Sequence, residues 1–335
     1  MDDGYRVDVT TVVAAVLFLA GIALVVWSVE HFVEAVARSA VSLGVSGFFL
    51  AVVLAGVDLE NAILGITAAY GDLSSLALGT VFGEAVFVLA VAVGVAGVLM
   101  PFETRVPRSY LLITLCVPIP MAALSLAGTL TWIDGALLTL SFFPLLLLVY
   151  ALERRASTRY MVAEEVEEVI GLEEEAAEGS TSSDGEDSRG SWYHLGVAIA
   201  ATVGMTVGSA LAVRGAEGVL TAFGLSGLAF GATVMSFIAS LEELFLTVEP
   251  VRQGRPEIAV GNVVGSTLFY VTANVGLIAL IGPVDMGGAV LTVQWPFFAL
   301  ALVLVVAMFY RGRVGRLEGV ALLALYVGYW IANYL

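Results

Sequence analysis

Apolar runs long enough to cross a lipid bilayer follow one another along this chain, and they constrain its fold more than any other feature. A helix needs about 20 apolar residues to span the hydrocarbon core of a membrane. Hydrophobic residues make up 59% of the 335 positions and charged residues only 13%, which is too apolar for a soluble globular protein. The runs also lack the alternating polarity of outer-membrane barrel strands. We therefore predict an all-α polytopic membrane protein with ten transmembrane helices, at residues 9–37, 44–70, 74–99, 107–128, 130–152, 192–213, 224–248, 257–281, 287–310 and 315–334.

The basic residues indicate how these helices are oriented. All fourteen are arginines, and the ten spans place twelve of them on one side of the membrane, leaving only Arg6 and Arg214 on the other. Because cytoplasmic loops are enriched in basic residues, both termini are predicted to be extracellular in a multi-pass protein of the cell membrane. The opening MDDGYR has two acids where a signal peptide has positive charge, so a cleaved signal peptide is not expected.

An acidic segment divides the chain into two halves. Residues 153–190 hold twelve acids and four arginines, and their net charge of −8 is half of the chain's −16. We predict a first five-helix repeat at 1–152, a solvated acidic cytoplasmic loop at 153–191 that ends in a flexible linker, and a second five-helix repeat at 192–335. The excess of acid and the absence of lysine are typical of a halophilic source.

The two halves share a pattern of motifs. The first half has "DLEN" (58–61) and "LGTVFGEAVF" (78–87), and the second has "SLEE" (240–243) and "VGNVVGSTLF" (260–269). The interval from Asn61 to Gly79 and the interval from Glu243 to Gly261 are both 18 residues. Because each half has an odd number of helices, the second half enters the membrane from the opposite side, and the repeat is predicted to be inverted.

Inverted repeats place two copies of a motif near the bilayer midplane. There, interrupted helices can turn backbone oxygens and helix ends toward a bound ion. The expected points of interruption are Gly56, Gly65 and Gly231.

Five carboxylates fall within the repeated motifs, in spans that are otherwise apolar. A charged residue at the bilayer centre costs at least about 2.5–3.5 kcal/mol on insertion scales, so cations, protons or water must compensate these five. Hydroxyl and amide groups accompany them at helical spacing, as in the four-residue steps of Asn262, Ser266, Tyr270 and Asn274. Packed together, four such helices would form a ring of oxygens suited to a hard cation such as Ca²⁺. We predict a cation site made by Glu243, Ser240, Ser236, Asn262, Ser266, Asp58, Asn61, Glu84, Thr80, Glu60 and Glu242.

Other readings of these residues stay open. Single groups such as Thr80 could serve only in packing between helices. Glu60 and Glu242 lie beside the polar stripes, and they could belong to a second site or to an aqueous path. His31 and His194 are expected at the membrane interface, away from the motifs, which argues against a zinc or transition-metal site.

No cofactor and no nucleic-acid partner is expected. The predicted partners are inorganic cations and the lipid bilayer, and protein partners are left open. Cys116 lies within the fourth span and, as the single cysteine of the chain, cannot form an internal disulfide.

At these motifs the sequence resembles the cation/Ca²⁺ exchanger superfamily, in particular its prokaryotic sodium/calcium exchanger-like members. The family carries patterns like G-T-S-L-P-E on its second and seventh helices and G-N-x-x-G-S-N on its third and eighth. The second half of this chain matches both, at Ser240, Leu241, Glu243, Gly261, Asn262, Gly265 and Ser266. The resemblance implies two inverted five-helix repeats and ion ligands at Glu243, Ser240, Ser266 and Asn262.

The first half departs from the family pattern. The family's first-repeat glutamate corresponds to Asn61, and the serine of the same motif corresponds to Asp58. The motif prolines and two small polar residues are replaced by Glu60, Glu242, Thr80 and Glu84. We interpret this as carboxylate charge that has been moved, with Asp58 or Glu84 in the place of the missing glutamate.

These observations predict a secondary active cation antiporter that alternates access as its first and sixth helices slide against the core. Exchange of Na⁺ for Ca²⁺ is the leading expectation. A cation/H⁺ antiporter, for Ca²⁺ or for Na⁺, is the alternative, because an acid that releases its ion can bind a proton. A cation channel and a non-transporting scaffold are further rivals. No HExxH motif or nucleophile elbow is present, so an enzyme is not expected.

Overall fold

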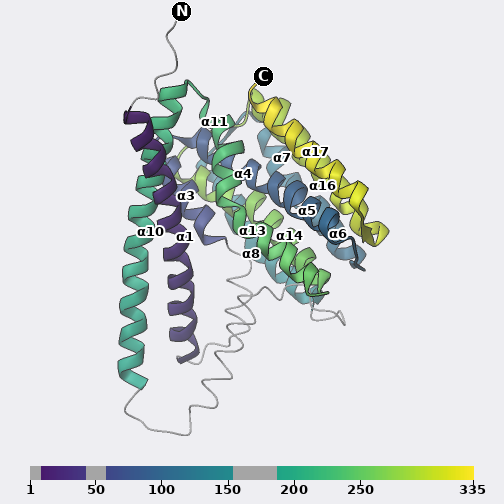
Figure 1. Cartoon of the computed structure of the whole chain (residues 1–335), viewed down its shortest axis with the longest axis horizontal. Coiled ribbons are helices and arrows are strands. Elements are labelled where there is room, and N and C mark those ends of the chain that lie inside the picture. The colour runs from purple at the N-terminus through teal and green to yellow at the C-terminus, as the bar shows by residue number, and fades with distance from the viewer. Residues whose placement is uncertain (1–8, 43–57, 154–186) are drawn as a thin grey trace, which may run out of the picture.

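The computed structural model describes residues 9–42, 58–153 and 187–335, and these ranges are almost entirely helical. Figure 1 shows a bundle in which α1 and α10 run as a long pair along one side, while α16 and α17 lie on the opposite side. The first half contains α1 (Val9–Ser42), α3 (Leu59–Tyr70), α4 (Ser74–Phe87), the π-helix η1 (Val88–Ala92), α5 (Val93–Leu99), β1 (Phe102–Glu103), α6 (Arg108–Cys116), α7 (Pro118–Ser125), β2 (Thr129–Leu130) and α8 (Trp132–Glu153).

The second half has the same kind of element order. It contains α10 (Asp187–Phe223), α11 (Gly227–Phe230), η2 (Gly231–Met235), α12 (Ser236–Ala239), α13 (Leu241–Arg252), α14 (Pro256–Phe269), η3 (Tyr270–Asn274), α15 (Val275–Ile281), β3 (Val284–Asp285), η4 (Val290–Gln294), α16 (Trp295–Arg311), β4 (Arg313–Val314) and α17 (Arg316–Asn333).

Seven segments of the described chain are long and apolar enough to cross a membrane. They are Val9–Phe32, Ser74–Leu99, Arg108–Ser125, Trp132–Val149, Gly196–Phe223, Pro256–Ile281 and Val290–Arg311. The pair Gly227–Ala239 and Leu241–Arg252, bent by 48°, makes an eighth if it is counted as one span. These segments overlap eight of the ten predicted spans. Of the other two, 44–70 is described only from residue 58 onward, and 315–334 forms α17, a helix of 18 residues.

Two spans form the centre of the bundle. In Ser74–Leu99 and Pro256–Ile281, 89% and 83% of the most apolar window is buried, against 28–39% in the other five. Each central span contains one π-helical turn, η1 or η3. Lipid tails are as apolar as the helices, so small residues and close packing hold such a centre together. The repeated motifs therefore lie in the most enclosed part of the protein.

Two short antiparallel strand pairs join loops of the first half to loops of the second. In one pair Phe102 lies opposite Val314, and in the other Leu130 lies opposite Val284. One further backbone hydrogen bond extends the first pair, from the Thr104 amide to the Gly312 carbonyl at 3.0 Å. These links fix the ends of helices that belong to different halves of the sequence.

Several helix boundaries differ from the predicted ones. The helix α10 begins at Asp187, inside the segment expected to be a flexible linker, and α1 continues to Ser42. The fourth span is divided at Val117, because Pro118 has no amide hydrogen to continue the helix of α6. The remainder of the acidic loop, residues 154–186, lies outside the described residues.

The three glycines that were expected to interrupt transmembrane helices differ in the structure. The π-helix η2 begins at Gly231, whereas Gly65 lies inside the regular helix α3. Gly56 lies outside the described residues. The sharpest break is at Ser240, where the backbone leaves helical geometry (φ −90°, ψ 10°) between α12 and α13. The seventh span is bent by 48° at this point, so Ser236 and Glu243 do not lie on one continuous helix.

Candidate functional site

The carboxylate of Glu243 is the centre of a buried polar cluster between α13 and α14. It accepts hydrogen bonds from Asn262 Nδ2 at 2.6 Å, Ser266 Oγ at 3.1 Å and the Tyr270 hydroxyl at 3.3 Å. The four-residue steps along α14 into η3 put these three donors on one face of the helix. Thr247, one turn after Glu243, accepts a longer hydrogen bond from Asn262 at 3.4 Å.

A second carboxylate reaches the same cluster from the first half of the chain. Asp58 caps the N-terminus of α3 by accepting a hydrogen bond from the Asn61 backbone amide at 3.0 Å, and it also accepts one from Asn61 Nδ2 at 2.5 Å. The Tyr270 hydroxyl lies 2.9 Å from Asp58 Oδ2. That hydroxyl therefore stands between Asp58 and Glu243 and connects the two repeated motifs.

The charge balance of this cluster favours a cation. The Tyr270 hydroxyl has one hydrogen, so it can donate fully to only one of the two carboxylates at a time. The ion pairs Glu249–Arg252 and Glu318–Arg313 lie elsewhere, and none of the described arginines is paired with Asp58 or Glu243. Glu243 is buried and Asp58 is half-buried, and two such carboxylates without an arginine partner must be compensated by a cation, by protons or by water.

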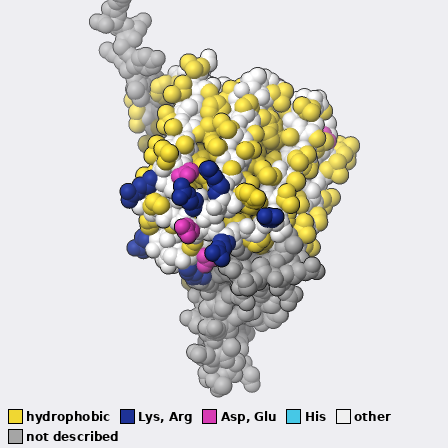
Figure 2. Space-filling model, turned by 90° about the vertical axis from the view of Figure 1, so that its right-hand side faces the viewer, with side chains coloured by type: hydrophobic (Ala, Val, Ile, Leu, Met, Phe, Trp, Pro, Cys, Tyr) yellow, Lys and Arg dark blue, Asp and Glu magenta, His cyan; other side chains and the backbone are white. Residues whose placement is uncertain are grey.

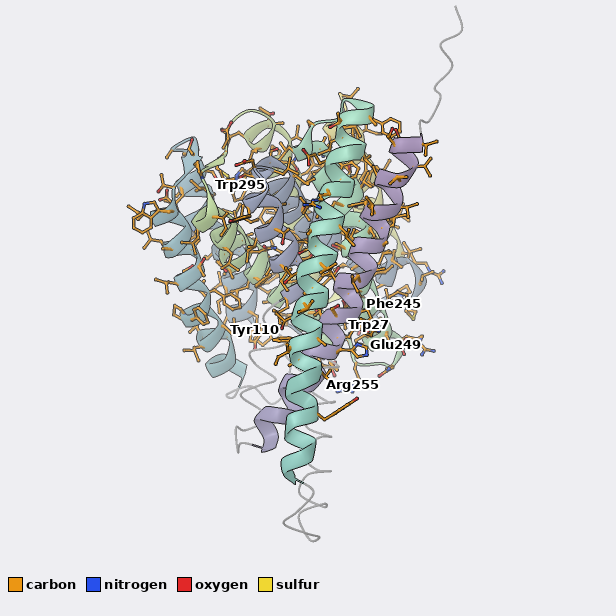
Figure 3. The ribbon with its side chains drawn as sticks, turned by 90° about the vertical axis from the view of Figure 1, so that its left-hand side faces the viewer. Trp27, Tyr110, Phe245, Glu249, Arg255 and Trp295 are labelled. Atoms are coloured by element: carbon orange, nitrogen blue, oxygen red, sulfur yellow. The ribbon has the colours of Figure 1, made fainter. Side chains whose placement is uncertain are left out.

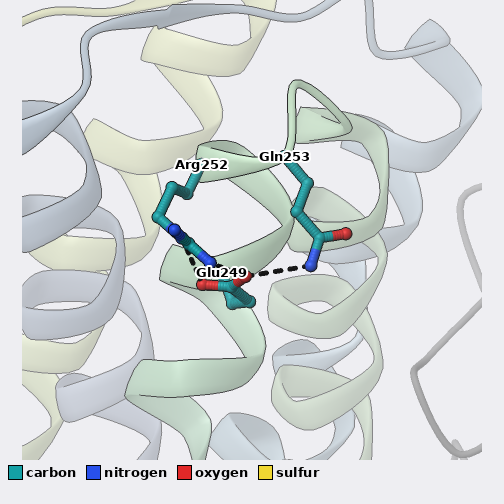
Figure 4. A network of polar contacts seen from close by, with 3 residues as sticks. All are labelled: Glu249, Arg252 and Gln253. Carbon is teal, nitrogen blue, oxygen red and sulfur yellow. Dashed lines mark hydrogen bonds and ion pairs between the residues drawn. The ribbon is translucent and has the colours of Figure 1, made fainter.

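The close ion pair on α13 lies at the exposed end of the helix. Figure 4 shows Glu249 held by Arg252, with a hydrogen bond of 2.6 Å from Arg252 Nε, and by Gln253 Nε2 at 2.9 Å. Figure 3 shows Glu249 near Phe245 and Arg255 at the same end of the molecule. This surface network leaves the carboxylate of Glu243 to the buried cluster.

Two further glutamates are buried without hydrogen bonds. Glu84 on α4 is fully buried and neither of its carboxylate oxygens has a partner, and Oε1 of Glu60 on α3 is likewise unpartnered. These oxygens are therefore available to an ion. Glu242 instead lies on the exposed side of α13, outside the cluster.

The hydroxyl groups of the predicted set behave differently from one another. Ser240 Oγ, at the break before α13, is buried and has no hydrogen-bond partner. Ser236 donates to the Thr233 carbonyl at 3.2 Å and Thr80 to the Leu76 carbonyl at 3.0 Å, so each is satisfied within its own helix. The hydrogen-bonded cluster brings together Glu243, Asn262, Ser266, Asp58 and Asn61, and it does not include Ser236, Ser240, Thr80, Glu60, Glu84 or Glu242.

Two members of the cluster, Tyr270 and Thr247, were absent from the predicted site. Helical spacing had already aligned Tyr270 with Asn262 and Ser266, although it was left out of the predicted ligands, and the four residues from Glu243 to Thr247 could have identified Thr247 in the same way. His31 lies on α1, where its Nδ1 is 2.7 Å from the Trp27 carbonyl and its ring lies against the Trp27 indole at a tilt of 38°.

Close contact between α4 and the seventh span holds the first-half motif against the second. A Cβ on Gly79 would lie 2.2 Å from the Leu228 carbonyl oxygen, and a Cβ on Gly231 would lie 2.2 Å from the Leu76 carbonyl oxygen. Only glycine permits the two backbones to approach so closely. The crossing places the helix of Glu84 directly beside η2 and α12.

The ligand chemistry is that of a mixed oxygen site. Within the described ranges, no group of three or more His, Cys, Asp or Glu side chains is gathered closely enough to hold a metal by itself. The cluster instead combines two carboxylates with hydroxyl and amide groups. Oxygen ligands of this kind suit Na⁺ or Ca²⁺ better than zinc or copper.

Comparison with known proteins identifies relatives along nearly the whole chain. The family model described as "Sodium/calcium exchanger protein" matches residues 13–151 and 193–335. The "Putative antiporter CaxA" of Alkalimonas amylolytica is 25% identical over 327 residues, which covers 95% of this chain and 97% of that protein. The "Sodium/calcium exchanger MaX1" of Methanosarcina acetivorans is 32% identical over 109 residues, covering 32% of this chain and 31% of that protein.

The fold is similar to that of a solved exchanger. A structure of the sodium-calcium exchanger NCX_Mj soaked with Na⁺ and Sr²⁺ superposes with a TM-score of 0.56, covering 95% of this chain and 97% of that one at 21% identity. The predicted all-α membrane fold is supported at this level.

Proposed function

The chain belongs to the sodium/calcium exchanger protein family, and we propose that it is a secondary active antiporter that exchanges Na⁺ for Ca²⁺ across the cell membrane. The family is one of membrane transporters. In this proposal, ten transmembrane helices form two inverted five-helix repeats, at 1–152 and 192–335, joined by the acidic cytoplasmic loop 153–191. Both termini face outward, as the arginine distribution favours.

The observation that carries the proposal is the hydroxyl of Tyr270 between Asp58 and Glu243. It puts one carboxylate from each half within reach of a single small ion, in the buried centre of the bundle. Ca²⁺ binds about six to eight oxygens, and the neighbouring oxygens of Ser266 and Asn262 add to the two carboxylates. The unpartnered oxygens of Glu84, Glu60 and Ser240 are candidate ligands for Na⁺ ions bound beside it.

Alternating access is supported by the arrangement of the outer helices. The long helices α1 and α10 pack against each other along one side of the bundle and contact the rest mainly through α3 (Figure 1). We propose that this pair slides against the core and opens the site to one side of the membrane at a time.

A cation/H⁺ antiporter is the second candidate, and Asn61 favours it. This position lacks the carboxylate expected from the family pattern, and the Asn61 side chain donates its Nδ2 hydrogen bond to Asp58. A carboxylate that releases Ca²⁺ in this buried site can bind a proton in its place, so the relocated carboxylates would exchange Ca²⁺ for protons. The relative from Alkalimonas amylolytica is named only as a putative antiporter, which fits either candidate.

Flux into proteoliposomes separates the candidates. We expect ⁴⁵Ca²⁺ uptake to follow an imposed Na⁺ gradient and to be unaffected by a pH gradient of equal size. Uptake driven only by the pH gradient would establish the second candidate. Flux far above carrier rates, with single-channel currents, would instead indicate a channel.

Variants of the site test the role of Glu243 directly. Glu243→Gln keeps the shape of the side chain and removes its charge, so it should abolish Ca²⁺ binding and uptake. Glu249→Gln on the same helix and Cys116→Ser on the exposed face of α6 should transport like the wild type. Wild-type uptake by Glu243→Gln would contradict the proposed site.

A further inference from the structure

An apolar groove lies on the outer face of the bundle between α6 and α16, away from the ion site. It has a volume of about 400 Å³. Its walls are lined by Leu111, Leu112, Leu115, Val303, Val306 and Ala307, and its charged end by Arg108 and Tyr310. Leu112 is 61% exposed and Val303 is 53% exposed, so the groove opens to the hydrocarbon of the membrane.

One end of the groove carries a positive charge held in a fixed position. Arg108 is the first residue of α6, and its guanidinium carbon lies 5.9 Å from the centre of the Tyr310 ring near the end of α16, which is a cation–π contact. Stacking uses the face of the guanidinium and leaves N–H groups along its edge for an anion. Tyrosine is common at the level of the lipid headgroups, so this end is placed at the membrane surface.

The chain around this end is strongly basic. Segments 102–108 and 311–318 hold five arginines against Glu103 and Glu318, and one of these arginines, Arg313, lies 3.9 Å from Glu318. The β1–β4 pairing keeps the two segments together. Figure 2 shows arginines gathered at one end of a face that is otherwise largely hydrophobic. Apolar walls that lead to a cationic end match the shape and charge of a lipid with an anionic headgroup.

We propose that this groove binds one anionic phospholipid, with an acyl chain between α6 and α16 and its phosphate at Arg108. A zwitterionic lipid has an acyl chain of the same kind, but its ammonium group would be repelled by the surrounding arginines. Basic pockets between membrane helices at the cytoplasmic surface bind acidic headgroups for the same reason. The site is independent of the ion cluster, and it requires no transport activity.

Native mass spectrometry of the detergent-purified full chain tests this site. With added phosphatidylglycerol, we expect one tightly retained lipid per protein, and with phosphatidylcholine of the same chain length much less. Arg108→Gln should weaken phosphatidylglycerol binding by about tenfold, because a charge-assisted hydrogen bond is lost. Arg252→Gln removes an arginine that is paired with Glu249 outside the groove, and it should bind lipid like the wild type.

A second variant tests the acyl-chain part of the groove without changing charge. Ala307→Trp fills the groove from α16 and should also abolish retention of phosphatidylglycerol, while inorganic phosphate should not compete with the lipid. If Arg108→Gln fails to fold, Ala307→Trp and the comparison of the two lipids still test whether the groove binds an anionic lipid. Equal retention of both lipids, or undiminished binding by Ala307→Trp, would overturn the proposal.

Discussion

Replacing Gly79 by alanine should force α4 away from α11 and η2. The added Cβ would lie 2.2 Å from the Leu228 carbonyl oxygen and 2.9 Å from the Ala232 amide nitrogen. Ordinary contacts begin at 3.4 Å, so α4 would have to move away from α11 by about 1.2 Å, the difference between 3.4 and 2.2 Å. Overpacking costs about 1–3 kcal/mol when side chains can adjust. Backbone atoms on both helices cannot adjust in this way, so we expect the loss to be at the upper end, about 3 kcal/mol.

The loss can be measured as the thermal unfolding midpoint of the purified protein in detergent. A loss of about 3 kcal/mol corresponds to a fall of roughly 6–12 °C for a chain of this order of size. Gly196→Ala is the matched control, because Gly196 lies in α10 and its added Cβ would meet nothing within 4 Å. That variant should be as stable as the wild type or slightly more stable, since alanine is the better helix former. An unchanged midpoint in Gly79→Ala would refute the close crossing.

Three further substitutions test the cluster around Tyr270. Tyr270→Phe removes the hydroxyl that links the two carboxylates, and isothermal titration should show weaker Ca²⁺ binding with the fold retained; unchanged affinity would exclude the hydroxyl from the site. Asp58→Asn preserves the cap of α3 but removes the charge, so it should lose Ca²⁺ binding. Its thermal midpoint should stay above that of Asp58→Ala, because the alanine variant also loses the cap, at a cost of about 1 kcal/mol. Glu84→Gln should be at least as stable as the wild type without ions, because an unpartnered buried carboxylate is removed. The rise in thermal midpoint on adding Na⁺ should be smaller in Glu84→Gln than in the wild type. A rise equal to that of the wild type would place Glu84 outside the ion sites.

Much of the fold follows from hydrophobicity, since membrane spans must satisfy their own backbone hydrogen bonds and are therefore long and apolar. Eight of the ten predicted spans overlap described segments that are long and apolar enough to cross a membrane. The boundaries were harder to predict because they depend on contacts outside the hydrocarbon. The start of α10 at Asp187 lies in a polar, acidic stretch where hydropathy gives no signal. The short strand pairs between distant loops likewise have no local signature.

The candidate site, like the fold, could be predicted from the sequence only in part. Helical spacing put Asn262 and Ser266 on one face of a helix, and the expected packing of the motif helices put Glu243 beside them; both donate to Glu243 in the structure. It could not show that Ser240 lies at a break between α12 and α13, because no proline or glycine marks that position in the sequence. Nor could it show that Tyr270 reaches Asp58, a contact between residues 212 positions apart in the sequence.

The paired helices α1 and α10 are longer than a bilayer requires. Their apolar segments of 24 and 28 residues correspond to about 36 and 42 Å of helix, whereas the hydrocarbon core is about 30 Å thick. The pair can therefore be displaced along the membrane normal by several ångströms while apolar residues still fill the hydrocarbon. Tilting of the helices or a thicker membrane reduces the length of apolar helix that extends beyond the hydrocarbon core. The thickness of the host bilayer is thus a physical limit on how far this pair of helices can travel.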